Sequence, residues 1–147
     1  MPPISSASAP SSVQFPMAKA SEDVDSAFLA LTGRYGLVGD ARSRLRLLMD
    51  LLVASPLAPT SIRSPWAVLN DHLADSLVAL DCEPLRPAQT VLDLGAGAGL
   101  PGLPLAIARP EARFTLLEAS ARKCRFLEVA VETCGLGNAE VVHDRAE

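Results

Sequence analysis

The chain has 147 residues, of which 49% are hydrophobic and 20% charged, and its formal net charge is −4. This length suits one domain of ordinary size, and the composition is typical of a globular protein rather than a disordered one. The acidic balance excludes a domain that binds nucleic acid through an overall positive charge, so any contact with RNA has to be local. No apolar run in the sequence approaches the ~20 residues of a membrane span.

The cysteines and the N-terminal segment both indicate a cytoplasmic protein. Cys82, Cys124 and Cys134 are odd in number and fit no common zinc spacing, which predicts buried thiols in a reducing compartment and no metal site. Residues 1–20 are rich in Ser, Ala and Pro and lack the basic start and apolar core of a secretory signal. We therefore expect a disordered tail there.

Residues 21–84 are expected to form a helical region. The pattern predicts a short helix over 22–31 capped by Ser21, a second over 41–54, and a third over 65–80 with a proline in its first turn. The apolar stripes of the second and third helices are Leu45, Leu48, Met49, Leu52, Leu69, Leu73, Leu77 and Leu80.

Three polar residues, His72, Asp75 and Ser76, flank the leucine stripe of the third helix. Such a group invites a catalytic interpretation. Polar residues one helical turn apart more often form a local hydrogen bond that positions a helix or a substrate, and we favour that role.

Residues 85–147 carry an α/β pattern. The expected elements are strands over 91–94, 114–117 and 139–142, a helix from the prolines at 101 and 104 to 108, and a helix from Ser120 to Gly135. The first strand is apolar enough to be covered on both faces. This order predicts a parallel sheet with right-handed crossovers, whose ligands lie at the carboxyl ends of the strands.

A glycine-rich turn follows the first strand. Gly95, Gly97 and Gly99 let the backbone turn sharply and approach a ligand that a Cβ would block. Glu118 lies at the end of the next strand, where a carboxylate can accept hydrogen bonds from both hydroxyls of a ribose. The two features together predict a nucleoside site, and Ala146 falls at the same edge of the sheet.

The spacing of the glycines separates two classes of cofactor. A dinucleotide fingerprint places a third glycine three residues after Gly97, where this chain has Leu100, and no hydride-transfer site is evident, which disfavours a nicotinamide oxidoreductase. The pattern D-x-G-x-G-x-G, which begins at Asp93, suits a cofactor with an amino-acid moiety and no pyrophosphate, namely S-adenosylmethionine. Asp93 is expected to orient the turn or to cap the loop that follows.

The run GAGAGLPGLPLAIARPEA, with VLDL before it and NAEVVHDRAE further on, resembles the bacterial small-subunit ribosomal RNA methyltransferase G family, formerly called glucose-inhibited division protein B. The upstream TSIRSP and DHLADSL are similar to that family as well, so that the resemblance covers about residues 60–147. It implies a Rossmann-like S-adenosylmethionine-dependent fold and methyl transfer to N7 of a guanine in the 16S ribosomal RNA of the small subunit.

The resemblance also implies the cofactor contacts. They fall on Gly95, Gly97 and Leu100 in the turn, on Glu118 at the ribose, and on Ala146 with Glu147 near the adenine. N7 of guanine has a lone pair and no proton to remove, so methyl transfer to it needs alignment rather than a general base. We therefore expect no catalytic acid or base.

Two groups of basic residues are candidates for a local RNA contact. Arg122, Lys123 and Arg125 follow the second strand and are expected to touch phosphates near the cofactor, although a solvated helix face explains them equally well. The second group comprises Arg34, Arg42, Arg44 and Arg46, for which a solvated helix face is the favoured interpretation.

Residues 85–147 supply three strands, whereas an open doubly wound sheet has about six. We therefore expect the N-terminal half of a methyltransferase domain, and weak or no methyl transfer by these residues alone. The alternative is a non-catalytic fragment that binds S-adenosylmethionine or the ribosome.

Overall fold

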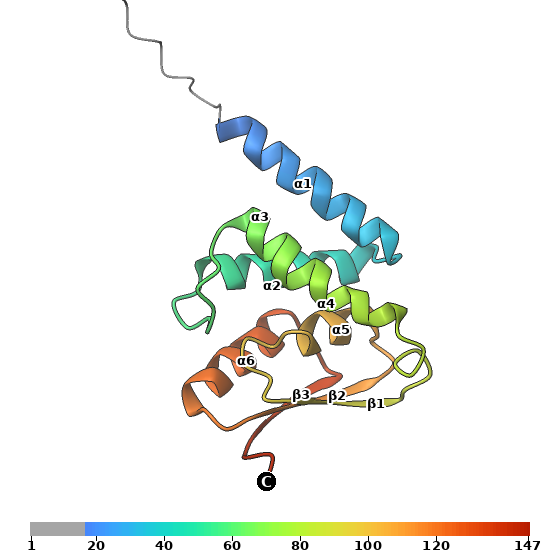
Figure 1. Cartoon of the computed structure of the whole chain (residues 1–147), viewed down its shortest axis with the longest axis vertical. Coiled ribbons are helices and arrows are strands. Elements are labelled where there is room, and N and C mark those ends of the chain that lie inside the picture. Colours follow the sequence, from blue (N-terminus) through green and yellow to red (C-terminus); the bar gives the residue numbers. More distant parts are fainter. Residues whose placement is uncertain (1–16) are drawn as a thin grey trace, which may run out of the picture.

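The computed structural model describes residues 17–147 and shows an α/β fold (Figure 1). The helices are α1 (Met17–Arg34), α2 (Gly39–Ala54), α3 (Pro65–Ala67), α4 (Asp75–Leu77), α5 (Gly102–Ala108) and α6 (Ala121–Thr133). Between and after the short helices lie a π-helical segment η1 (Val68–Ala74) and a 3-10 segment η2 (Val78–Asp81). The strands are β1 (Thr90–Leu94), β2 (Arg113–Glu118) and β3 (Ala139–His143).

The three strands form one parallel sheet in the order β1-β2-β3. Leu94 lies beside Leu117, Leu117 lies beside Val142, and Glu118 lies beside His143. The expected parallel sheet and its strand–helix–strand order are therefore confirmed. Because all three strands run the same way, the turns after β1, β2 and β3 emerge at one edge of the sheet.

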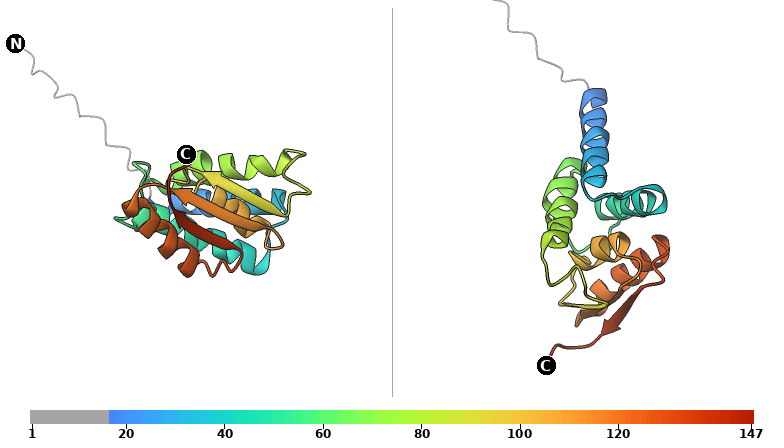
Figure 2. Two further views of the ribbon diagram at one scale, coloured as in Figure 1. Left: turned by 90° about the horizontal axis from the view of Figure 1, so that it is seen from below. Right: turned by 90° about the vertical axis from the view of Figure 1, so that its right-hand side faces the viewer.

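All described helices lie on one face of this sheet. Figure 1 shows them stacked above the strands, and the view from below in Figure 2 shows the strands in front of every helix. The expectation that β1 is covered on both faces was wrong, since Leu92 is 56% exposed and Leu94 60% exposed. Val91 and Asp93 alternate with them and are less exposed, so only that side of β1 packs.

A single hydrophobic core joins the helical region to the sheet. Helices α5 and α6 contact β2, and α2 packs against α5 and α6 on the side that faces away from the sheet. The apolar stripes expected of the second and third helices supply much of this core. The largest fully buried side chains are Phe114, Phe126, Leu45, Leu48, Leu52, Leu69, Leu73, Leu77, Leu103, Leu116, Leu127 and Val68.

The N-terminal helix is longer than expected. It begins at Met17 rather than after Ser21, so Ser21 lies within α1 and is not its cap. Gly33 also lies inside α1, and the break falls at Gly36, which has φ +65°. Residues 17–20 of the expected tail belong to this helix, and residues 1–16 lie outside the described residues. No helix of the described part is long and apolar enough to cross a membrane.

The helix expected over 65–80 is a continuous helical run whose middle, η1, is π-helical. Ser64 caps its start, since its hydroxyl accepts a hydrogen bond from the amide of Ala67 at 3.2 Å. Pro65 occupies the first turn as predicted. A π segment is wider than an α-helix and often occurs at functional sites, and hydrophobic spacing cannot reveal it.

Asn138 fixes the loop before β3 against the end of α5. Its side-chain nitrogen lies 3.0, 3.1 and 3.0 Å from the carbonyl oxygens of Ala106, Arg109 and Ala112. Ala106 and Arg109 belong to the last turn and the C-cap of α5, whose carbonyls a helix end leaves unpaired, and Ala112 lies in the loop before β2. The buried thiols expected from the sequence are confirmed for Cys124 and Cys134, whereas Cys82 is exposed because it follows the last helical turn before β1.

The close contact of α5 with β1 and β2 predicts the cost of a methyl group at Gly102. A Cβ there would lie 2.4 Å from Leu116 Cδ2 and 2.6 Å from Asp93 Oδ2. We expect Gly102→Ala to lower the free energy of unfolding by ~1–3 kcal/mol, the usual cost of overpacking, as measured by urea denaturation.

The matched control is Gly33→Ala, because Gly33 is helical and nothing lies within 4 Å of the added Cβ. This variant should be neutral or more stable by about 0.5–1 kcal/mol. Equal stability of the two variants would show that α5 does not pack against β1 and β2 as described.

Candidate functional site

The glycine turn after β1 is anchored to the end of β2. The amides of Gly95 and Ala96 donate to the carbonyl oxygen of Leu117 at 2.8 and 2.9 Å. Gly95 has φ +69° and Gly97 φ +55°, conformations that residues with a side chain rarely adopt. A Cβ on Gly95 would meet nothing within 4 Å. The backbone of the turn is thus open on the side where a ligand would approach.

The second half of the glycine turn is fixed to β1 and leads into α5. The amide of Gly102 donates to Asp93 Oδ2 at 3.0 Å, so Asp93 caps α5 and fixes the turn between them, as expected. Burial raises the pKa of Asp93, which the bond from Gly102 partly offsets. Gly97, Gly99 and Gly102 have the spacing of the dinucleotide fingerprint, and Gly102 is the glycine of close helix–strand packing. The expectation that this chain lacks the third glycine of that fingerprint was therefore wrong, and glycine spacing alone does not separate the two classes of cofactor.

Glu118 joins three elements at the carboxyl edge of the sheet. Its Oε2 accepts a hydrogen bond from the amide of Gly97 at 2.9 Å, and its Oε1 accepts one from the amide of Ser120 at 2.9 Å. The bond from Ser120, assisted by that from Gly97 and by the charge of Lys123, lowers the pKa of Glu118 although burial opposes the shift. A carboxylate has about four acceptor positions, so about two remain for a ligand.

Two adjacent cavities meet at Gly95. The first has a volume of about 320 Å³ and lies over the ends of β2 and β3. It is lined by Gly95, Leu117, Glu118, Ala119, Asp144, Arg145, Ala146 and Glu147. The structure thus brings together the residues expected at the ribose and at the adenine.

The second cavity has a volume of about 430 Å³ and lies between the glycine turn and the helical run 65–81. It is lined by Asp71, His72, Asp75, Ser76, Ala79, Gly95, Ala96, Gly97, Ala98, Leu100 and Pro101. Leu100 and Gly97 therefore lie in this cavity rather than in the first. The two cavities together contain every residue that the sequence analysis assigned to the cofactor.

Of the three polar residues expected to form a local hydrogen bond, Ser76 does so, His72 binds a residue outside the helical run, and the side chain of Asp75 forms no hydrogen bond with the described residues. The hydroxyl of Ser76 donates to the backbone carbonyl of His72 at 2.6 Å. His72 Nε2 lies 2.8 Å from the hydroxyl of Thr60, which also accepts from the amide of Ile62. Thr60 was not predicted as a partner of His72, because the loop that brings it back to the helix has no periodic pattern in the sequence.

The loop that carries Thr60 is held by Arg63. Its guanidinium donates to the carbonyl oxygens of Leu52, Ser55 and Ala58 at 3.3, 2.6 and 3.0 Å. The first of these belongs to the last turn of α2, where a cation also interacts favourably with the helix dipole. Arg63 therefore fixes the path from α2 to the residues beside the second cavity.

The two basic groups differ in the structure. Arg34 pairs with Asp81, Arg46 pairs with Asp25, and Arg42 donates to the carbonyl oxygen of Leu37 at 3.2 Å, so three of the four arginines of the N-terminal group are engaged within the protein. Arg122, Lys123 and Arg125 are exposed on α6, which begins directly after β2 at Ser120, whose hydroxyl caps it by accepting from the amide of Lys123. No ion pair to these three is formed by the residues that the structure describes.

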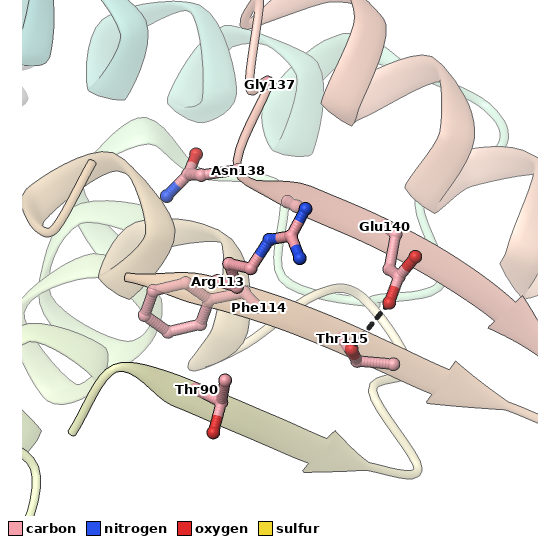
Figure 3. A pocket seen from close by; sticks show the side chains of 8 residues that line it. Thr90, Arg113, Phe114, Thr115, Gly137, Asn138 and Glu140 are labelled. Carbon is pink, nitrogen blue, oxygen red and sulfur yellow. Dashed lines mark hydrogen bonds between the residues drawn. The ribbon is translucent and has the colours of Figure 1, made fainter. Parts of the chain in front are cut away.

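A further hollow of about 260 Å³ lies at the opposite, amino ends of the strands (Figure 3). Its side chains include Arg113 and Asn138, and the hydroxyl of Thr115 donates to Glu140 at 2.9 Å across the bare face. None of the expected site residues lies there. Within residues 17–147 no group of three or more His, Cys, Asp or Glu side chains is placed to hold a metal ion.

Comparison with known proteins gives one family. Residues 48–147 match the family model described as rRNA small subunit methyltransferase G (GidB). Three proteins named ribosomal RNA small subunit methyltransferase G are similar to the chain. Those of Rubrobacter xylanophilus and Marinobacter nauticus are each 48% identical, over 85 and 88 residues, and that of Stenotrophomonas maltophilia is 47% identical over 88 residues.

The aligned residues are 58–60% of this chain. They are 33% of the length of the first relative and 40% of the other two, so the chain spans well under half of the relatives that it matches.

The hydrogen bonds to Glu118 predict a pH-dependent contribution to stability. The folded-state pKa lies below the ordinary value of 4.5. The carboxylate therefore stabilises the fold above that value, and its contribution is lost as the pH falls through the folded-state pKa. We expect Glu118→Gln to lower the free energy of unfolding by ~1–2 kcal/mol at pH 7, with the difference from the parent shrinking below pH ~4.

Urea denaturation at pH 7 and at lower pH measures this difference. Glu83→Gln is a suitable control, because Glu83 is exposed and lies in the connection that leads into the amino end of β1, whereas the glycine turn follows the carboxyl end of that strand. A difference that stays constant over the whole pH range would contradict the assigned charge of Glu118.

Proposed function

The chain belongs to the rRNA small subunit methyltransferase G family, and from this premise we propose that it binds S-adenosylmethionine across the two cavities that meet at Gly95. The observation that carries the proposal is their shared wall, a glycine turn whose backbone is open toward both. The reaction that we propose for the whole domain is methyl transfer to N7 of a guanine in 16S ribosomal RNA. Such a substrate would place the protein in the cytoplasm.

The residues present fit this cofactor. Glu118 retains acceptor positions for a ribose, and Ala146 and Glu147 line the cavity beside it, where an adenine would lie. Because Gly95 has no side chain, the ligand can approach its backbone closely. Gly97 and Leu100 line the cavity that would receive the methionine portion. When bound, S-adenosylmethionine supplies an electrophilic methyl group on a sulfonium ion.

The protein's own contribution to such a reaction is alignment. N7 of guanine carries a lone pair and loses no proton, so the residues have to orient the base and exclude water rather than act as a base. This agrees with the hydrogen bonds of the second cavity, in which His72 Nε2 lies 2.8 Å from the hydroxyl of Thr60 and the hydroxyl of Ser76 donates to the helix backbone. We assign no general acid or base.

Arg122, Lys123 and Arg125 are proposed to contact RNA phosphates. They lie at the start of α6, which begins at the carboxyl edge of the sheet where the two cavities open. They are exposed, and their charge is not neutralised by a described carboxylate within ion-pair distance. Phosphate contacts of this kind position a protein on RNA without reading its sequence.

A second candidate function is binding of S-adenosylmethionine or the ribosome without turnover. The specific observation in its favour is the coverage, since the aligned residues are only 33–40% of the relatives' length. Cofactor binding is common to both candidates, whereas methyl transfer to small ribosomal subunits separates them.

Calorimetric titration tests the cofactor proposal. We expect S-adenosylmethionine to bind saturably, NAD to bind no more than weakly, and Gly95→Val to weaken S-adenosylmethionine at least about tenfold because the side chain fills the ligand space. Gly36→Val is the matched control: Gly36 has φ +65° against +69° for Gly95, and in both a Cβ would meet nothing within 4 Å.

The control carries the same backbone strain at a distance from the cavities, so it should bind as the parent does. Equal loss in both variants would assign the effect to strain. Preference of the parent for NAD would overturn the choice of cofactor.

Salt dependence tests the RNA contact. We expect replacement of Arg122 and Arg125 by Ala to reduce the slope of log affinity against log salt concentration by about one to two for a 16S ribosomal RNA fragment. The matched control removes the same charge at the amino ends of the strands, through Arg86→Ala and Arg113→Ala. An equal reduction by both pairs would indicate a non-specific effect of net charge.

A further inference from the structure

The second cavity contains two carboxylates that the fold does not use. His72 is bound to Thr60, and the hydroxyl of Ser76 is bound to the helix backbone. Asp71 and Asp75 line the same cavity, and no described side chain forms an ion pair or a hydrogen bond with either of them. The opposite wall is the glycine turn, so these carboxylates face the place where the methyl donor would lie.

Asp75 is the better placed of the two. It begins α4, which packs against α5, the helix that follows the glycine turn. Asp71 lies one helical turn earlier, inside η1, which has no comparable contact with α5. Asp75 also follows directly on the π segment, whose greater width displaces the next turn of the helix, and such segments recur at functional sites.

The chemistry of a guanine fits a carboxylate at this position. The Watson–Crick edge of the base carries two adjacent donors, N1–H and the N2 amino group, and the two oxygens of a carboxylate can accept both. N7 lies on the other side of the purine. A guanine between the two walls can therefore turn its Watson–Crick edge to the helix and N7 to the glycine turn.

Methyl transfer gives this carboxylate a second effect. The N7 lone pair forms the new nitrogen–carbon bond, the electrons of the sulfur–carbon bond return to sulfur, and the positive charge passes from sulfur to the purine, with no proton lost. A carboxylate hydrogen-bonded to N1–H then faces a cationic ring. Such an interaction is stronger in the transition state than in the ground state, which is the condition for catalysis.

We propose that Asp75 binds the Watson–Crick edge of the target guanine and stabilises the positive charge that the base acquires. The proposal rests on the proposed function. It assigns the side of the second cavity formed by the helical run 65–81 to the base, while the side formed by the glycine turn would receive the methionine portion of the cofactor. A charged carboxylate also rejects adenine, which presents an unprotonated N1 acceptor at that edge.

Binding of nucleosides tests the proposal without turnover. The 147-residue chain is titrated with guanosine and with 7-methylguanosine, each with and without saturating S-adenosylhomocysteine, at a mildly acidic pH at which 7-methylguanosine keeps N1–H and its positive charge. Affinities are measured by NMR. We expect 7-methylguanosine to bind about tenfold more tightly than guanosine, because its ring is cationic, and Asp75→Asn to bring the ratio close to one. Asp50→Asn, an exposed change on α2, should leave the ratio unchanged.

The outcomes separate this inference from the cofactor proposal. A parent chain that binds S-adenosylhomocysteine but shows no preference for 7-methylguanosine overturns the role of Asp75 alone. The role of Asp75 is also overturned if Asp75→Asn weakens the binding of S-adenosylmethionine and leaves the binding of the nucleosides unchanged, since the carboxylate would then bind the ammonium group of the cofactor. Failure of S-adenosylhomocysteine to bind overturns the cofactor proposal, whereas an Asp75-dependent preference without it still supports the base pocket.

Discussion

The carboxylate of Glu118 is the constraint on which the candidate site depends. It ends β2, and its two oxygens hold the glycine turn through Gly97 and the start of α6 through Ser120. The carbonyl of the preceding residue, Leu117, binds the first two amides of the turn. Four backbone amides are thus fixed by two adjacent residues at one edge of the sheet. Because the positions of both cavities follow from the path of this turn, the end of β2 determines the geometry of the whole site. The proposed ribose contact would use acceptor positions of a group that the fold has already oriented.

The helical run 65–81 has two roles in this structure. The run 65–81 contributes leucines to the common core and polar residues to the cavity on its other side. The leucines fix the distance of the run from α5, and the hydrogen bonds of Arg63 and Thr60 fix the loop that leads into the run from α2. The same element therefore stabilises the fold and forms a wall of the site. Under the proposals above, the helical run would contact the target base, α6 the RNA phosphates, and the turns after β1 and β2 the cofactor.

Much of this architecture could be predicted from the sequence, because its signals are local. The strands, α5, α6 and the cap at Ser120 follow from runs and spacings within a few residues, and the distance from Gly95 to Glu118 reflects one strand–helix–strand unit. The misses depend on contacts between distant segments. The bond from Thr60 to His72 requires a loop to fold back, and the exposure of Leu92 depends on which elements cover the second face of the sheet. Gly102 was missed for another reason, since the spacing was counted from Gly95 and Gly97 rather than from Gly97 and Gly99.

The position of β1 has a thermodynamic consequence. Among the described strands it has a neighbour on one side only, and its outer face is bare, yet it carries the glycine turn. An edge strand opens locally at a lower free energy than a central one, so the turn belongs to a part of the sheet that frays easily. A ligand that touches the ends of both β1 and β2 binds only when the edge is closed, and its binding free energy is then added to the stability of that edge. Occupancy of the site by the ligand and order of the edge strand are thereby linked, because the bound ligand holds the ends of β1 and β2 together.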